Sequence, residues 1–407
     1  MRFFVTLHAK SICLMTALCM TAAFAQLTST PAQAQTQTQT QTAEAAASTP
    51  VAFVYVSSNS KGSSTNEING FAAAANGKLT PVSGSPFRDD VTSMATNGKY
   101  LYASTRSGIY VAGFAIEANG ALRWSASTDI VQYNQNDCGS SGPLFLDHTG
   151  ASLYDLEFDG NACANNSYQS LATNTSSGKL RNIGSAASGE WFYLPATFIG
   201  NNTYAYTAVC LYDMYWEIAG FKRSSSGLLS QININAPTPA PKTGDFFCPS
   251  QAAADPTNHV AITFQPVNQN TFSPDGPAQL ATYTAGSSGN LSTTSTVGNM
   301  PETSVGTVTG VGMAPSGKLF AVAGTAGLQV FHFNGASPIT HDTGLLTKDQ
   351  VDQVFWDNDN HLYAISQSAG KLFVFTVTPT SANQAAGSPY PISNPLDLAV
   401  LPKTPRP

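Results

Sequence analysis

The sequence predicts an all-β fold: a seven-bladed β-propeller of four-stranded antiparallel blades, whose ring is closed by pairing of the N- and C-terminal strands. Three observations lead to this prediction: a recurring strand–turn–strand pattern, a second hairpin that follows it at fixed spacing, and two half-units at the ends of the folded region. The repeat spans roughly 43 to 60 residues, which is the period of propeller blades. An open two-sheet sandwich predicts neither this period nor the matched ends.

The first hairpin of each unit is clearest in three copies. In each, an apolar or alternating strand leads into a tight turn whose residues tolerate left-handed geometry, and a second strand follows. The copies are SMATNGKYLYAST (Ser93 to Thr105), GMAPSGKLFAVAGT (Gly312 to Thr325) and VFWDNDNHLYAISQ (Val354 to Gln367).

A second hairpin follows the first in each unit. It consists of an aromatic-bearing strand, a turn centred on Gly, and a Leu two residues after that Gly. The four clearest copies place Leu79, Leu122, Leu229 and Leu291 in matched positions. Together the two hairpins form one four-stranded blade.

The ends of the repeat region complement each other. The region opens in the middle of a blade with VAFVYVSS, beginning at Val51, and it finishes with the single strand NPLDLAVLP, ending at Pro402. Pairing of the two would complete the seventh blade and remove the open sheet edge. We therefore place the propeller at residues 51–402, with residues 403–407 as a C-terminal tail.

The first 50 residues have a different composition. Arg2 and Lys10 precede a short apolar run that closes on Ala25, a pattern typical of a cleaved signal peptide over residues 1–25. Cleavage is expected after Ala25 or Ala34. Residues 26–50 are rich in Gln, Thr and Ala and read as a disordered linker. The sequence thus predicts a secreted or periplasmic protein.

Composition excludes several classes of function. The chain of 407 residues carries only 18 Lys and Arg, with a net charge of −6, so it lacks the basic stripe of a nucleic-acid binder. No second apolar run predicts membrane insertion once the signal is removed. Phosphate-cradling and metalloprotease motifs are absent, so we expect no cofactor and no metal.

Four cysteines remain after the predicted leader, an even number that favours disulfides in an oxidising compartment. We expect all four to lie in loop insertions rather than strands. Proximity within the blade register favours two pairs: Cys138 with Cys163, and Cys210 with Cys248.

Blades three to five carry the long loops, all on one face of the propeller, which we call the top face. This is the face where the second strand of a blade leads to the third and the fourth leads to the next blade. Three neighbouring insertions each combine aromatic rings with an acid. One interpretation is a small core beneath the loops; the other is a cleft for a neutral ligand. The candidate ligand-binding residues are Glu190, Trp191, Tyr193, Tyr212, Asp213, Tyr215, Trp216, Glu217, Asp245 and Phe246.

The repeats also resemble a known family. VYVSSNS (from Val54), GKLTPVSGSPF (Gly77 to Phe87) and GSPY (Gly387 to Tyr390) are similar to the repeats of seven-bladed lactonase-type propellers, which include 6-phosphogluconolactonase and exported bacterial propellers of the YVTN type. Enzymes of that family carry a Gly-Pro-Arg-His segment at an inner strand. The counterpart here is Gly142-Pro143-Leu144-Phe145, so the resemblance transfers the fold but no catalytic residue.

These observations predict an exported binding or scaffolding module. Its partner would be a small neutral ligand, a glycan, or a peptide or protein, bound at the top face over blades three to five. The alternative is a lactonase-like hydrolase with acids at the channel mouth. An enzyme should bring together titratable groups with shifted pKa values, whereas a binding module should present exposed rings.

Overall fold

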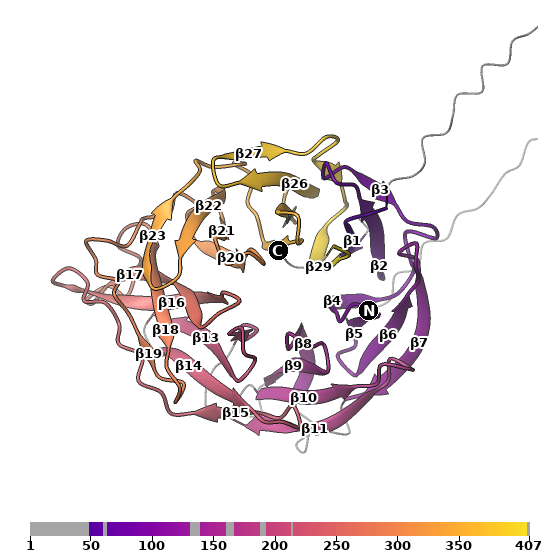
Figure 1. Ribbon diagram of the computed structural model, residues 1–407, viewed down its shortest axis with the longest axis horizontal. Helices are drawn as coiled ribbons and strands as arrows, with labels where there is room; N and C mark the ends of the chain where they lie inside the picture. The colour runs from indigo at the N-terminus through magenta and orange to yellow at the C-terminus, as the bar shows by residue number, and fades with distance from the viewer. Residues whose placement is uncertain are drawn as a thin grey trace, which may run out of the picture. The chain divides into compact units, whose positions relative to one another are not determined.

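The computed structural model describes residues 49–59, 63–130, 139–159, 167–187, 193–212 and 215–404. Within these residues every regular element is a β-strand, and the strands form seven antiparallel sheets arranged as a ring (Figure 1). The sequence-based prediction of a seven-bladed propeller is confirmed. The predicted leader, and the linker as far as residue 48, lie outside the described residues.

Blades are numbered from the N-terminus, and each is given from its inner to its outer strand. Blade one contains β29 (Pro395–Pro402), β1 (Ala52–Asn59), β2 (Asn66–Ala73) and β3 (Leu79–Pro81). Blade two contains β4 (Val91–Thr96), β5 (Tyr100–Thr105), β6 (Tyr110–Ile116) and β7 (Leu122–Asp129). Blade three contains β8 (Gly139–Leu146), β9 (Ser152–Asp159), β10 (Ser167–Thr173) and β11 (Leu180–Ala187).

The remaining blades follow the same order. Blade four contains β12 (Thr197–Phe198), β13 (Tyr204–Leu211), β14 (Tyr215–Arg223) and β15 (Leu229–Ile232). Blade five contains β16 (Asp245–Ala254), β17 (His259–Asn268), β18 (Gln279–Ala285) and β19 (Leu291–Ser292). Blade six contains β20 (Val308–Met313), β21 (Leu319–Gly324), β22 (Gly327–Asn334) and β23 (Ser337–His341). Blade seven contains β24 (Gln353–Trp356), β25 (His361–Ser366), β26 (Lys371–Thr378) and β27 (Ser381–Gln384), with β28 (Tyr390–Pro391) also pairing with β26.

The repeated Gly-x-Leu pattern has a physical explanation. The matched leucines begin the outer strands β3, β7, β15 and β19. In blade two, a Cβ on Gly120 would come within 2.5 Å of the Phe53 ring of blade one, so only glycine fits between the blades there. The Gly120 carbonyl also accepts a hydrogen bond of 2.8 Å from the Tyr55 hydroxyl. The repeat therefore encodes contact between neighbouring blades.

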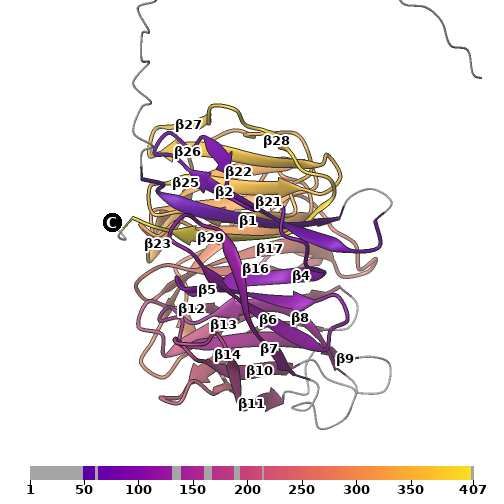
Figure 2. The same ribbon diagram turned by 90° about the vertical axis from the view of Figure 1, so that its right-hand side faces the viewer.

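Ring closure occurs as the sequence predicts. Strand β29 pairs antiparallel with β1, from Ala52 opposite Pro402 to Ser58 opposite Pro395 (Figure 2). Leu398, Ala399, Val400 and Leu401 of β29 are all buried, and they join the apolar layers on both sides of blade one. The two ends of the repeat region thus form one continuous sheet.

Hydrogen bonds between inner strands, or the residues just before them, link most of the ring near the top face. They connect blade five to blade six, six to seven, seven to one, one to two, and two to three. The donor and acceptor residues are Gln251 with Thr309, Thr309 with Val351, Gln353 with Asp397, Met94 with Asp397, and Leu144 with Ser93. Blade four is built differently, because its inner strand β12 has two residues.

The expectation that the cysteines lie outside strands is wrong for both described cysteines. Cys210 belongs to β13 and Cys248 to β16. The strands of blades four and five extend into the segments that the sequence suggested were loops, because hairpin pairing continues to Leu211 opposite Tyr215 and to Asp245 opposite Asn268. The longer strand pairing gives these backbone N–H and C=O groups hydrogen-bond partners within the protein, whereas in a loop of that length they would bond to solvent.

Candidate functional site

Blades four and five are joined at the top face by a covalent link. A disulfide connects Cys210 of β13 to Cys248 of β16, with their Cα atoms 5.2 Å apart. This confirms the predicted pairing of these two cysteines. Because β12 is so short, β13 packs directly against β16, the inner strand of the next blade. The two blades are joined by this disulfide near the start of β16, and near the end of β16 by a hydrogen bond of 2.9 Å from the Ala254 amide to the Thr197 hydroxyl of β12.

An aromatic pair lies beside this disulfide. Trp216 is directly opposite Cys210 in the β13–β14 ladder, so both side chains leave the same face of blade four. Phe246 precedes Cys248 by two residues on β16 and shares its face. The rings of Trp216 and Phe246 stack with centroids 4.3 Å apart and an interplanar angle of 27°. We call Trp216, Phe246 and the Cys210–Cys248 disulfide the aromatic platform.

The platform combines both interpretations suggested by the sequence. Cys248 is fully buried and Phe246 is partly buried, as expected for a small core beneath the loops. Trp216 nevertheless remains 42% exposed, which is unusual for a large ring that is held in a stack. One face of the indole packs on Phe246, and the exposed part is available for contact with a ligand.

The acids near the platform do not line it as a group. Asp245 is buried, and its carboxylate lies 3.4 Å from the Lys242 ammonium, which also lies 3.1 Å from Asp275. A hydrogen bond to Asp275 raises the pKa of Lys242. Asp245 is thus engaged in an ion cluster at the base of the β16–β17 hairpin.

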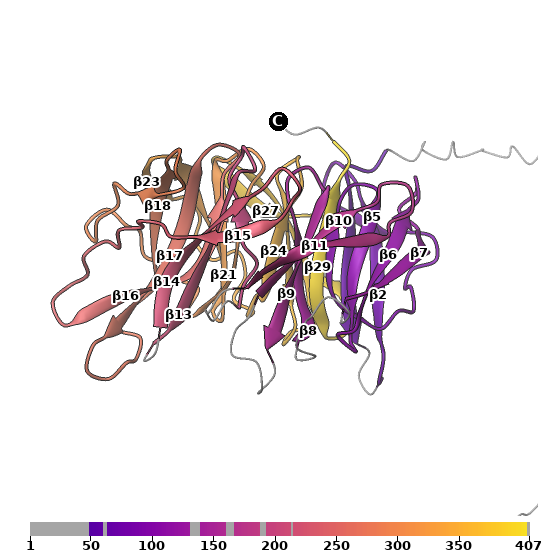
Figure 3. The ribbon, with the colours of Figure 1, turned by 90° about the horizontal axis from the view of Figure 1, so that it is seen from below.

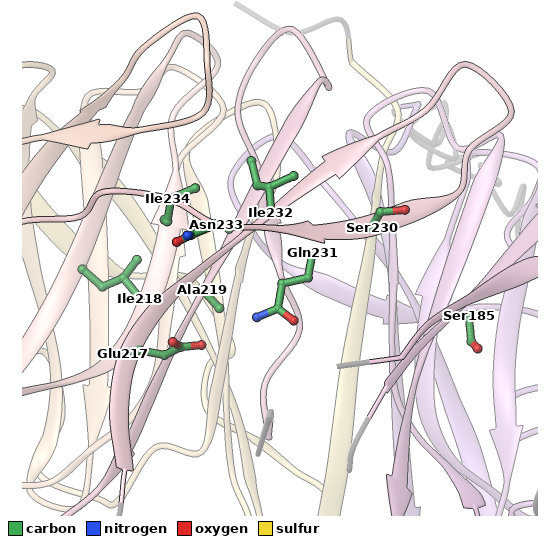
Figure 4. A pocket seen from close by; sticks show the side chains of 10 residues that line it. Ser185, Glu217, Ile218, Ala219, Ser230, Gln231, Ile232, Asn233 and Ile234 are labelled. Carbon is green, nitrogen blue, oxygen red and sulfur yellow. The ribbon is translucent and has the colours of Figure 1, made fainter. Parts of the chain in front are cut away.

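Glu217 follows Trp216 in β14, so its side chain leaves the opposite face of the blade. It lines a cavity of about 660 Å³ between the outer parts of blades three and four. Figure 4 shows its carboxylate below Asn233, with Gln231 nearby and Ser185 contributed by a separate strand at right. Glu217 and Trp216 therefore belong to two different surfaces.

The tyrosines of the candidate set occupy positions around the top of blade four. Tyr193 is 39% exposed, Tyr212 is partly buried, and burial raises the pKa of both. Tyr215 begins β14 opposite Leu211. Glu190, Trp191 and Asp213 lie outside the described residues, as do Cys138 and Cys163, whose predicted disulfide stays a prediction.

Two buried carboxyls with strongly raised pKa values were not among the sequence candidates. Asp397 of β29 accepts hydrogen bonds from the Met94 amide and, at 2.7 Å, from Nε2 of Gln353. Glu157 of β9 accepts one from the Ser167 hydroxyl at 3.4 Å. Burial raises the pKa of each to about 7. Their sequence signal was an acid within a largely apolar strand: Asp397 in LDLAVL, and Glu157 beside Asp155 in SLYDLEF.

The segment Gly142 to Phe145, which the sequence set against the Gly-Pro-Arg-His of lactonase-type propellers, lies in β8. Leu144 is buried in the layer between blades two and three. Phe145 stacks on Tyr154 with centroids 5.1 Å apart and meets Tyr168 edge-on at 5.2 Å. Both side chains are therefore packing residues, which explains why apolar types occupy these positions.

A second cavity, of about 500 Å³, lies among the turns of blades five and six on the face opposite the top. It contains His259 and His332, and a carboxylate holds each: Asp255 lies 3.0 Å from His259, and Asp342 lies 3.3 Å from His332. Across the described residues no group of three or more His, Cys, Asp or Glu side chains is placed to hold a metal ion. Nor does that part of the chain contain a helix that could span a membrane.

Comparison with known proteins points to one fold. No family model matches the sequence, and no curated protein matches it. Solved structures do match. A candidate 6-phosphogluconolactonase from Bacteroides uniformis is 12% identical with a TM-score of 0.63, covering 86% of this chain and 99% of that chain. A second candidate 6-phosphogluconolactonase, from Bacteroides fragilis, is 12% identical with a TM-score of 0.60, covering 87% and 99%.

A protein from Lactobacillus plantarum is also 12% identical, with a TM-score of 0.55 and coverage of 86% of this chain and 99% of that chain. At this level of identity the likeness concerns the fold, because residues outside the packing pattern are free to differ. The blades, their closure and these structural matches together identify the fold as a seven-bladed β-propeller, similar to the fold of the two candidate 6-phosphogluconolactonases.

Proposed function

We propose that this protein is an exported binding or scaffolding module whose ligand contacts lie on the top face over blades three to five. The observation that carries this proposal is the aromatic platform: Trp216 is 42% exposed although it is stacked on Phe246. The disulfide beside it holds the two strands in place, so the ring is presented at little entropic cost.

The platform supports contact with an uncharged surface. An exposed indole face stacks on the apolar face of a sugar or on the side chains of a peptide. The nearby charges at Lys242, Asp245 and Asp275 already interact with one another. Affinity should therefore depend weakly on salt.

Binding of glycan and peptide panels to the purified mature chain tests the proposal. We expect Trp216→Ala to weaken binding by roughly 1 to 3 kcal/mol, the scale of one lost ring contact. Trp124, which is 60% exposed on β7 of blade two, provides the matched control. Equal losses for Trp216→Ala and Trp124→Ala would contradict the proposed site.

The second candidate function is lactone hydrolysis, and the observation that favours it is the pair of carboxyls with pKa values near 7, Asp397 and Glu157. Such groups can transfer protons at neutral pH. However, both Asp397 oxygens accept hydrogen bonds that join neighbouring blades, which is a structural use of the group. We therefore prefer the binding function.

An assay with 6-phosphogluconolactone separates the two functions. We expect no hydrolysis, because the counterpart of the family's Arg-His pair is Leu144 and Phe145. Hydrolysis that survives Trp216→Ala and is lost in Glu157→Gln would show that the protein is an enzyme and would contradict the proposed binding function.

A further inference from the structure

The part of β14 nearest the top face lacks a partner strand on its outer side. Strand β15 pairs with Gly220–Arg223 only, although β14 begins at Tyr215. After Ile232 the chain leaves β14 for blade five, where the Asn235 carbonyl accepts a hydrogen bond of 2.8 Å from the Leu291 amide. Within the described residues, no strand therefore pairs with the outer edge of this part of β14.

This open edge is particular to blade four. In blades two and three the fourth strand pairs along the whole third strand. In blades one, five, six and seven the fourth strand is short, but the chain that follows it hydrogen-bonds to the third strand. The pairs are Val82 with Gly70, Pro301 with Leu280, Thr343 with Val330, and Ala385 with Val374. The third strand of every other blade therefore has backbone partners on its outer side.

The backbone groups of alternate residues of β14 point to the open edge. The Arg223 amide donates a hydrogen bond of 2.8 Å to the Thr203 carbonyl on the side of β13. Because this direction alternates along an antiparallel ladder, the N–H and C=O groups of Ile218 and Trp216 point away from β13. In the described part of the chain, no hydrogen bond reaches these two residues from that side. Such an edge is a template for pairing with another extended chain.

The cavity of about 660 Å³ lies along this edge. Strand β14 contributes Glu217–Gly220 to its lining, and the chain from Ser230 to Ile234 contributes another wall. Strand β15 lies beside β11 of blade three, which adds Ser185 (Figure 3). The Ile218 side chain packs in the apolar layer between blades four and five and the residue is only 7% exposed, so it meets the cavity mainly through its backbone. A cavity of this size is within the range of ligand sites.

A strand added at this edge would present its side chains alternately to two surfaces. Side chains opposite Ile218 and Trp216 would lie on the side of blade five, where the Trp216 ring is 42% exposed. A side chain opposite Glu217 would lie on the side of blade three. Glu217 is the one ionisable residue among the ten described residues that line the cavity, so a basic side chain complements this position. The matching ligand therefore alternates apolar and basic residues.

We propose that the outer edge of β14, at Trp216 and Ile218, binds an extended segment of another protein by strand addition. The segment runs antiparallel to β14, in line with β15. It carries an apolar residue opposite Ile218, a basic residue opposite Glu217 and an aromatic residue opposite Trp216. The spacing of the backbone groups along a strand edge suits a peptide rather than a sugar. This inference rests on the proposed binding function and narrows its ligand to a protein segment.

Selection of random linear peptides displayed on phage, against the purified protein with its disulfides intact, supplies the probe. We expect the enriched sequences to read apolar, basic and aromatic in this order. The best binder is then synthesised with an N-methyl group either on the residue before the basic one or on the basic residue itself. The first methyl group removes the N–H that donates to the Ile218 carbonyl, so it should weaken binding about tenfold or more. The second N–H points away from β14, so its loss should leave the affinity unchanged.

The two methylated peptides separate strand addition from contact through side chains alone, and the protein is the same in both measurements. Glu217→Gln should also weaken binding about threefold, with Glu117→Gln as the control that leaves it unchanged. Equal affinities for the two methylated peptides, or a selection that enriches no peptide, would overturn the inference. Glycan binding that depends on Trp216, without peptide binding, would overturn it and leave the proposed binding function intact. Failure to bind either glycans or peptides would contradict both.

Discussion

The closure side of the ring, at blades seven, one and two, differs from the side formed by blades four and five. On the closure side, Asp397 links three blades: it accepts hydrogen bonds from Gln353 of blade seven and from Met94 of blade two. On the other side, the inner strand of blade four is reduced to Thr197–Phe198, and the Cys210–Cys248 disulfide joins the blades. Buried apolar side chains pack at both junctions, but only the junction of blades four and five also has a disulfide and the 42% exposed ring of Trp216.

The difference shows how one fold can combine stability with a surface for binding. A junction in which a full-length inner strand pairs and hydrogen-bonds to its neighbours leaves little room for a variable site. Where the inner strand is shortened, a disulfide can hold the blades and leave neighbouring side chains such as Trp216 free to remain exposed. The candidate site accordingly lies where the disulfide joins blades four and five.

Among the changes that test this comparison, removal of the closing strand β29 should lower the free energy of unfolding most. Deletion of residues 394–407 removes the buried side chains of Leu398, Val400 and Leu401 together with Ala399, a loss of about 5 kcal/mol or more at roughly 1.5 kcal/mol for each Leu or Val. Total stabilities are about 5 to 15 kcal/mol, so we expect no cooperative unfolding transition by calorimetry. Deletion of residues 26–48 is the control and should leave the melting temperature unchanged. Equal melting temperatures for both deletions would show that closure does not stabilise the ring.

Removal of the disulfide between blades four and five should lower the free energy of unfolding by a smaller amount. The double variant Cys210→Ser and Cys248→Ser opens a loop with a sequence separation of 38 residues, which corresponds to about 4 kcal/mol by the chain-entropy estimate. Denaturant unfolding should show this loss while the circular dichroism of the native state is preserved. A further loss on reduction of the double variant would report the predicted Cys138–Cys163 link, and a stability equal to wild type would mean that the disulfide is dispensable for this junction.

The contribution of the closure side of the ring to stability should depend on pH. Burial raises the pKa of Asp397 to about 7, so the folded state holds this proton more tightly than the unfolded chain does. Its stabilising contribution is present below the ordinary Asp pKa of about 4 and is lost as the pH rises toward 7. Asp397→Asn keeps an acceptor for the Met94 amide but turns a second donor toward Nε2 of Gln353, so it should lower stability at every pH. Because the variant cannot titrate, it should also flatten the decline in stability between pH 4 and 7 by roughly 2 to 4 kcal/mol.

Free energies of unfolding measured at pH 4.5, 6 and 7.5 check this prediction. Glu117→Gln, at an exposed ion pair with Arg123, is the control and should leave the pH profile unchanged. Parallel profiles for wild type and Asp397→Asn would show that Asp397 does not titrate in this range.

The smallest loss in the free energy of unfolding is expected for a substitution in the aromatic platform. Trp216→Ala removes a stacked but 42% exposed ring, so we expect a loss of about 1 kcal/mol in the free energy of unfolding. Trp124→Ala removes a more exposed ring and should cost less. A loss above that of the disulfide variant would place Trp216 in the structural core and weaken its assignment to a binding surface.

Much of the fold could be predicted because its determinants are local and repeated. The turns at Gly98, Gly317 and Asn360 take the left-handed backbone that their residue types favour. The Gly-x-Leu repeat marks the start of outer strands, and the complementary ends marked the closure. Sequence spacing also paired Cys210 with Cys248, since blade register brings their strands together.

The site could be predicted only in part. Trp216 and Phe246 were singled out from separate insertions, and the structure stacks them. Glu217 was grouped with Trp216 because they are adjacent in sequence, but adjacent residues of a strand face opposite sides. Phe272, in the loop between β17 and β18, was not singled out; it is 45% exposed with φ of 50°, and both properties depend on the folded loop.

The sequence by itself determined the number of blades, their strand order and the closure of the ring, because each of these follows from turn chemistry and from apolar patterning that recur along the chain. Only the tertiary structure decided which acids form ion pairs, which aromatic rings stay exposed, and which buried carboxyls have a pKa near 7. Those properties depend on neighbours that come from other blades, as Asp397 depends on Met94 and Gln353, and no local pattern specifies such neighbours.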